Sequence, residues 1–142
     1  MEQKPDIIKI AAAILNSEGK LLIVHHRGQD FWISPGGKPE PGETHKQTLE
    51  RELYEELRLK VVGEPVFFHE SPVEVIPDGS GRTVKIFSYF VETEGKPEIN
   101  PEDKIYEYAW ISREDYENNK YVLATVMGKH TNPILIKQGK LK

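Results

Sequence analysis

The 142-residue sequence contains no cysteine. This absence excludes disulfide bonds, thiolate catalysis and zinc sites built on thiolates, and it is compatible with a reducing compartment. A long hydrophobic run is also missing, because the first apolar stretch covers only about nine residues and Lys9 interrupts it. No basic segment precedes that stretch. We therefore expect neither a membrane span nor a signal peptide, and we expect a cytoplasmic protein.

The chain has no excess of positive charge. Its formal net charge is −4 and its pI is about 5.8. Such a protein has no general attraction to a nucleic acid polymer or to an anionic membrane, so neither is an expected partner. A phosphate-bearing ligand would need a metal ion or local cations. The length and the lack of repeats or linkers predict a single domain over residues 1–142.

Apolar runs separated by turn signals indicate an α/β protein with a mixed sheet and helices packed against it. Residues 7–15 and 20–26 are apolar and β-prone, and the turn-forming residues between them predict a hairpin. Further strands are expected at 31–33, 60–70, 82–93 and 105–111. Residues 34–43 contain three prolines and three glycines, so we expect an ordered loop without regular structure.

One helix of about fourteen residues is predicted directly after this loop. Thr44 and Gln47 fit a capping box, in which the threonine caps the helix and the glutamine reaches back to it. Leu49, Leu53 and Leu57 recur every four positions and give the helix an apolar stripe. We expect this stripe to pack against the sheet.

An acidic stripe lies beside the apolar one. Glu52, Glu55 and Glu56 are three or four residues apart, so their carboxylates share one side of the helix and repel one another. Carboxylate oxygens are suitable ligands for hard cations such as Mg²⁺ or Mn²⁺, and a bound cation would reverse the repulsion. Arg51 lies away from the leucines and is predicted to pair with Glu43 at the end of the loop.

The spacing of these residues resembles the Nudix box, a motif written G-x5-E-x7-R-E-U-x-E-E-x-G-U with U aliphatic. In this chain the box runs from Gly37 to Leu59 and ends on the segment RELYEELRL. The flanking segments WISPG and YAWIS also resemble the family's frame. The resemblance implies a Nudix fold, in which a mixed sheet is sandwiched between helices in an α/β/α arrangement.

The resemblance also implies an activity, the Mg²⁺-dependent hydrolysis of a pyrophosphate bond in a nucleoside diphosphate linked to another group. Mn²⁺ is a potential substitute for Mg²⁺. The expected substrate is a (d)NTP or a modified NTP, as for MutT-like members. The alternative substrates are ADP-ribose, nucleotide sugars and dinucleoside polyphosphates, and the alternative of another class is a non-catalytic module that senses nucleotide. The fold also allows a homodimer, by analogy only.

By position in the motif, the implied metal ligands are Glu52, Glu55, Glu56 and a carbonyl group of Gly36 or Gly37. Glu55 is the implied candidate to help deprotonate the attacking water. Glu43 and Arg51 are the implied supporting pair of the catalytic site.

Two positions depart from the family's pattern. Arg58 stands where the box has a glycine that tolerates a left-handed conformation at the helix end, and a non-glycine residue there costs about 1 kcal/mol. Lys104 stands where many members have a glutamate that serves as a general base. The nearest substitutes are Glu102, Asp103 and Glu107, and the sequence does not choose between them.

Residues outside the acidic stripe are candidates for substrate binding. Arg27 and His25 end the second predicted strand and are predicted to contact phosphate, although a solvated strand end is the alternative. Gly37 and Lys38 are further candidates in the loop. Asn132 faintly resembles the base-reading asparagine of MutT-type members, with a turn or cap asparagine as the alternative.

Overall fold

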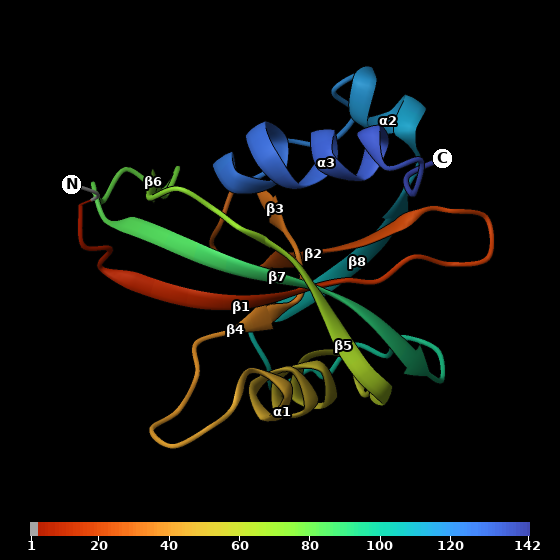
Figure 1. Cartoon of the computed structure of the whole chain (residues 1–142), viewed down its shortest axis with the longest axis horizontal. Helices are drawn as coiled ribbons and strands as arrows, with labels where there is room; N and C mark the ends of the chain where they lie inside the picture. Colours follow the sequence, from red (N-terminus) through yellow and green to blue (C-terminus); the bar gives the residue numbers. More distant parts are fainter. Residues whose placement is uncertain (1–2) are drawn as a thin grey trace.

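The computed structural model describes residues 3–142 and arranges them in layers, with helix α1 on one side of the strands and α2 and α3 on the other (Figure 1). One sheet has the order β4 (Gly36–Gly37), β1 (Ile7–Ala13), β7 (Thr83–Glu94) and β5 (Lys60–Glu70), and β6 (Glu74–Val75) also pairs with β7. The second sheet has the order β3 (Trp32–Ile33), β2 (Leu21–His26) and β8 (Ile105–Ile111). The predicted mixed α/β fold is confirmed, since β1 runs parallel to β7 and antiparallel to β4.

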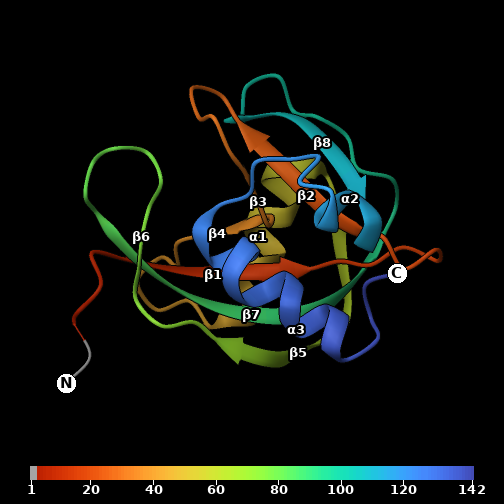
Figure 2. The ribbon, with the colours of Figure 1, turned by 90° about the horizontal axis from the view of Figure 1, so that it is seen from above.

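The helices cover the two faces of this strand layer. Helix α1 (His45–Leu57) follows β4, and the short helix α2 (Arg113–Glu117) follows β8. A π-helix, η1 (Met127–Thr131), continues directly into α3 (Asn132–Lys137), which lies over β1 and β7 when viewed from above (Figure 2). Within residues 3–142, none of these helices has the length and apolar character that crossing a bilayer requires.

Strands β1 and β2 contribute side chains to a core on each face of the strand layer, because both strands carry apolar runs. Successive side chains of a strand point to opposite faces, so a continuous apolar run supplies both faces at once. Ile10 and Leu22 pack in the core against the leucines of α1, whereas Ala13 and Leu21 pack in a second core with α3. The predicted apolar stripe of α1 is confirmed, because its three leucines are fully buried.

The predicted hairpin of the first two strands is wrong beyond its turn. Hydrogen bonds close the turn, including one from the Leu22 amide to the Ile14 carbonyl at 2.9 Å, but β1 and β2 then separate into different sheets. The structure also corrects the loop at 34–43, because Gly36 and Gly37 form β4 and pair with β1. The side-chain-free backbone of the two glycines lets the loop approach β1 closely.

Local signals set both ends of α1 as predicted. The Thr44 side chain accepts a hydrogen bond from the Gln47 amide at 3.1 Å, and the Gln47 side chain accepts one from the Thr44 amide at 2.9 Å. At the other end Arg58 adopts a left-handed conformation, with φ 58° and ψ 23°. Its guanidinium lies over the Tyr54 ring, 5.1 Å from the centroid. Arginine thus occupies a backbone conformation that favours glycine.

The variant Arg58→Gly is expected to stabilise the protein. Relief of the left-handed strain contributes about 1 kcal/mol, and loss of the exposed cation–π contact with Tyr54 costs about 0.5 kcal/mol. The free energy of unfolding, measured by urea titration, should therefore rise. Arg58→Ala is the matched control, because it loses the ring contact and keeps the strain, and it should lower stability. A less stable Arg58→Gly would contradict this account of the helix end.

Candidate active site

A cavity of about 730 Å³ opens between the loop that precedes α1 and the C-terminal segment. Its volume is in the range of small-molecule binding sites. The acidic side chains that line it are Glu52, Glu55, Glu56, Asp78, Glu102 and Asp103. The basic ones are Lys9, His26, Arg27, Lys38, Arg82 and Lys104. Its apolar lining includes Ile7, Phe31, Val75, Ile76, Val84, Ile86, Val126 and Met127.

Arg51 connects the loop to the helix, in the predicted pair with Glu43. The Arg51 guanidinium donates to both Glu43 carboxylate oxygens, at 2.7 and 2.9 Å, and to the Lys38 carbonyl at 3.0 Å. The hydrogen bonds from Arg51 are the main reason that the pKa of Glu43 falls to about 2. Arg51 also donates to Glu52 at 2.7 Å and lies 3.6 Å from a Glu55 oxygen. One cation therefore offsets part of the repulsion along the acidic stripe.

Glu56 is the most deeply buried member of the stripe, with only 3% of its surface exposed. One carboxylate oxygen accepts a hydrogen bond from the Gly36 amide at 3.1 Å. The other oxygen is buried and has no hydrogen-bond partner among the described residues. Burial raises the pKa of Glu56, and the attraction of Lys9 opposes that rise. An orphaned buried carboxylate oxygen at the cavity is the kind of atom that a bound cation would satisfy.

The two glycines of β4 make room for this arrangement. Gly36 has φ 141°, and a Cβ atom there would collide with the Ile10 carbonyl oxygen. A Cβ atom on Gly37 would instead collide with the carboxylate of Glu52. Burial raises the pKa of that Glu52 carboxyl, while Arg51 acts against the rise. The backbone of β1 thus requires glycine at position 36, whereas glycine at position 37 leaves the Glu52 carboxylate where it lies.

The donor set suits a hard divalent cation. The side chains of Glu52, Glu55 and Glu56 and the carbonyls of Gly36 and Gly37 offer oxygen atoms, which Mg²⁺ and Mn²⁺ prefer. As they stand, no three acidic, histidine or cysteine side chains within residues 3–142 form a group that could hold a metal ion. The unpartnered Glu56 oxygen is the observation that favours a cation here.

The predicted substrate-binding residues separate into two groups. Arg27, Gly37 and Lys38 line the cavity. His25 does not, and the neighbouring His26 lines it instead. Adjacent residues of a strand point to opposite faces, and the pairing with β8 shifts register between these two histidines. Burial, followed by the charge of Lys9, lowers the pKa of His26 to about 4.

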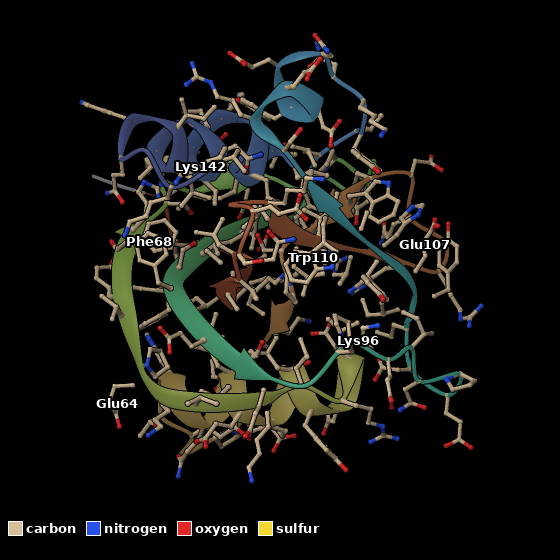
Figure 3. All side chains as sticks on the ribbon, turned by 90° about the vertical axis from the view of Figure 1, so that its right-hand side faces the viewer. Glu64, Phe68, Lys96, Glu107, Trp110 and Lys142 are labelled. Carbon is tan, nitrogen blue, oxygen red and sulfur yellow. The ribbon has the colours of Figure 1, made fainter. Side chains whose placement is uncertain are left out.

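His25 belongs to a separate polar and aromatic cluster. Its ring nitrogens lie 2.9 Å from a Glu107 oxygen, 2.7 Å from the Tyr106 hydroxyl and 2.6 Å from the Gln29 carbonyl. The ring also stacks on Trp32, with centroids 4.9 Å apart. Glu107 lies on the outer side of β8, away from the cavity lining (Figure 3). Among the predicted substitutes for the general base, only Glu102 and Asp103 line the cavity.

Asn132 lies next to Thr131, which lines the cavity. The asparagine side chain is fully buried, and neither its oxygen nor its nitrogen has a hydrogen-bond partner among the described residues. Asn132 is the first residue of α3 and directly follows η1, and its side chain makes no helix-capping hydrogen bond.

Sequence reasoning missed Lys9, which lines the cavity. A signal for Lys9 was present, because it is the one charged residue in a strand whose other residues are all apolar.

Substituting each glycine by alanine is expected to have different results. Gly36→Ala should lower the free energy of unfolding by roughly 3 kcal/mol or more, because the added Cβ atom would collide with the backbone of Ile10. Gly37→Ala should cost about 1 kcal/mol or less, because the flexible Glu52 side chain can move away. Urea unfolding with and without Mg²⁺ measures both. Gly37→Ala should lose Mg²⁺-dependent stabilisation, and full retention of that effect would contradict the assignment of Glu52.

Comparison with known proteins places this geometry in a family. The model of the NUDIX domain matches residues 7–129. A CTP pyrophosphohydrolase of Escherichia coli K12 is 37% identical over 90 residues, which cover 60% of this chain and 62% of that protein. An 8-oxo-dGTP diphosphatase of Haemophilus influenzae is 38% identical over 78 residues, covering 49% and 57% respectively. The aligned part thus spans less than two thirds of either relative.

Solved structures agree over a longer stretch. The solution structure of the E. coli ORF135 protein is 30% identical, covers 93% of this chain and 90% of its own, and superposes with a TM-score of 0.68. The predicted resemblance and the predicted Nudix fold are therefore confirmed. The chain belongs to the NUDIX domain family.

Proposed function

We propose that this protein hydrolyses a phosphoanhydride bond of a nucleoside triphosphate or a modified nucleoside triphosphate. The main support for this proposal is that one cavity brings the acidic stripe of α1 together with several cationic side chains. Glu52, Glu55 and Glu56 stand beside Arg27, Lys38 and Lys104 in its lining. In a protein of net charge −4, this gathering of cations in one cavity suits a phosphate chain.

In the proposed reaction, the oxygen of water forms a bond to one phosphorus, and the bond from that phosphorus to the bridging oxygen breaks. Attack at the α-phosphorus gives a nucleoside monophosphate and pyrophosphate. Arg27 and Lys38 bind phosphate oxygens and orient the chain, as cations do in phosphoryl-transfer sites. Glu52, Glu55 and Glu56 would hold a divalent cation, whose positive charge would offset the charge developing on the phosphate oxygens.

Glu55 is the proposed acceptor of the proton from water. Its side chain is half-exposed, at 51%, and faces the cavity, so it is accessible to water while Glu56 is not. Glu102 and Asp103 are the alternatives, because both line the same cavity and Lys104 cannot act as the carboxylate base that many relatives carry. The Glu43–Arg51 pair holds the loop that carries Gly37 and Lys38 against the helix.

The proposed substrate class is supported by two relatives of the chain, a CTP pyrophosphohydrolase and an 8-oxo-dGTP diphosphatase. The cavity also provides an apolar wall for a nucleoside, including Phe31, Ile86 and Val126. Asn132 is the proposed base-contacting residue. Its buried amide has no hydrogen-bond partner within residues 3–142, and an amide can pair with both a donor and an acceptor on a base edge.

The variant Glu55→Gln is expected to lower kcat about 100-fold, because an amide cannot accept the proton. The measurement is pyrophosphate and phosphate release in Mg²⁺, over a panel of canonical and oxidised dNTPs, CTP, ADP-ribose and dinucleoside polyphosphates. Glu50→Gln is the matched control, since Glu50 lies on the same helix, is exposed and does not line the cavity. The control should keep wild-type activity.

The other outcomes of this panel decide between the remaining hypotheses. Unchanged turnover in Glu55→Gln would contradict the role of Glu55 as general base and would favour Glu102 or Asp103 in that role. Turnover of ADP-ribose alone would contradict a nucleoside triphosphate substrate and would support the nucleotide-sugar class. No turnover of any compound would favour a nucleotide-sensing module. Repeating the panel with Asn132→Leu tests base recognition, because the order of preferred nucleotides should change.

A further inference from the structure

Lys9 occupies an unusual position for a lysine. It stands in β1, where alternate residues share a face, and Ile7, Lys9 and Ala11 all line the cavity. Lys9 is the middle of these three residues and the only charged residue of the strand. Packing needs no charge there, and moving an ammonium group from water to a half-buried strand position is costly unless it gains a partner.

The ammonium of Lys9 is held in place but not saturated. Its Nζ donates to the Ser34 carbonyl at 2.8 Å, which fixes the long side chain along the start of the loop. A lysine ammonium carries three N–H donors. Among residues 3–142, no second hydrogen bond and no ion pair within 4.0 Å is found for this Nζ. Two donors are therefore available at the cavity wall.

The electrostatic neighbours of Lys9 place it beside the acidic stripe. Glu56 and Glu52 attract its charge, and the charge of Lys9 in turn acts on His26. Neither Glu52, Glu56 nor His26 forms a hydrogen bond or an ion pair with the Lys9 ammonium. Because Lys9, Glu52 and Glu56 line the same cavity, a phosphate chain that binds beside the stripe lies on the side of the Lys9 ammonium.

We propose that Lys9 binds the phosphate chain of the substrate, using the two N–H donors that Ser34 leaves free. This inference rests on the proposed function and adds a residue of β1 to its site. Because Ser34 already orders the side chain, little conformational entropy is lost on binding. The competing reading is that Lys9 acts only as a counter-charge for Glu56.

The test is calorimetric titration with inorganic pyrophosphate in Mg²⁺ buffer, since pyrophosphate carries the phosphate part common to the candidate substrates. Lys9→Met should weaken pyrophosphate binding about tenfold or more, the usual effect of losing a charged hydrogen bond. Lys20→Met is the matched control, because it removes the same charge from a residue outside the cavity lining. The control should bind pyrophosphate like the wild type.

Other results overturn the inference. Wild-type affinity for pyrophosphate in Lys9→Met, with altered affinity for Mg²⁺ alone, would leave Lys9 as a counter-charge only. Absence of pyrophosphate binding by the wild type would also refute it. If circular dichroism shows that Lys9→Met is unfolded, Lys9→Gln replaces it, with the same expected loss.

The inference and the proposed function fail separately. Nucleotide turnover by the wild type, together with unchanged pyrophosphate binding by Lys9→Met, refutes the role of Lys9 and leaves the hydrolase intact. Loss of pyrophosphate binding in Lys9→Met, without turnover by the wild type, supports Lys9 as a phosphate-binding residue of a module that does not hydrolyse.

Discussion

Mutual repulsion among the carboxylates of Glu52, Glu55 and Glu56 is the constraint on which the arrangement of the site depends. Each carboxylate finds a different form of compensation. Arg51 contacts two of them, whereas Glu56 has one amide donor and the more distant charge of Lys9, and its second oxygen has no partner in the described part of the chain. The compensation is incomplete at the cavity. This incompleteness is what gives the site its capacity to bind a cation and, through it, phosphate.

The scaffold holds this unfavourable charge distribution because loop, helix and sheet are tied together at several points. Arg51 links Glu43 to the helix, and the Gly36 amide links the loop to Glu56. The pairing of Gly36 and Gly37 with β1 brings the same loop onto the sheet. The buried leucines of α1 anchor its other face. The acidic residues therefore cannot relieve their repulsion by moving the helix away.

Local features were predictable from sequence, and long-range ones were not. The capping box at Thr44, the leucine stripe and the Glu43–Arg51 pair depend on neighbouring positions, so spacing alone indicated them. Turn signals, however, do not determine which sheet a strand joins, and the hairpin prediction failed there. His26 lines the cavity in place of the predicted His25 for a related reason. Which of the two side chains faces the cavity depends on how β2 pairs with β8, and this pairing shifts register between them. The sequence showed Lys9 as a charged residue in an apolar strand, but its proposed role depends on its position near Glu56, which only the structure gives.

The account is tested most directly by titrating the protein with Mg²⁺ in a calorimeter, without nucleotide. If incomplete charge compensation creates the site, the wild type binds Mg²⁺ saturably. Glu56→Gln, which keeps the shape of the side chain and removes its charge, then binds Mg²⁺ about tenfold more weakly or worse. Equal Mg²⁺ affinity in the two proteins, or no saturable binding by the wild type, would contradict the account.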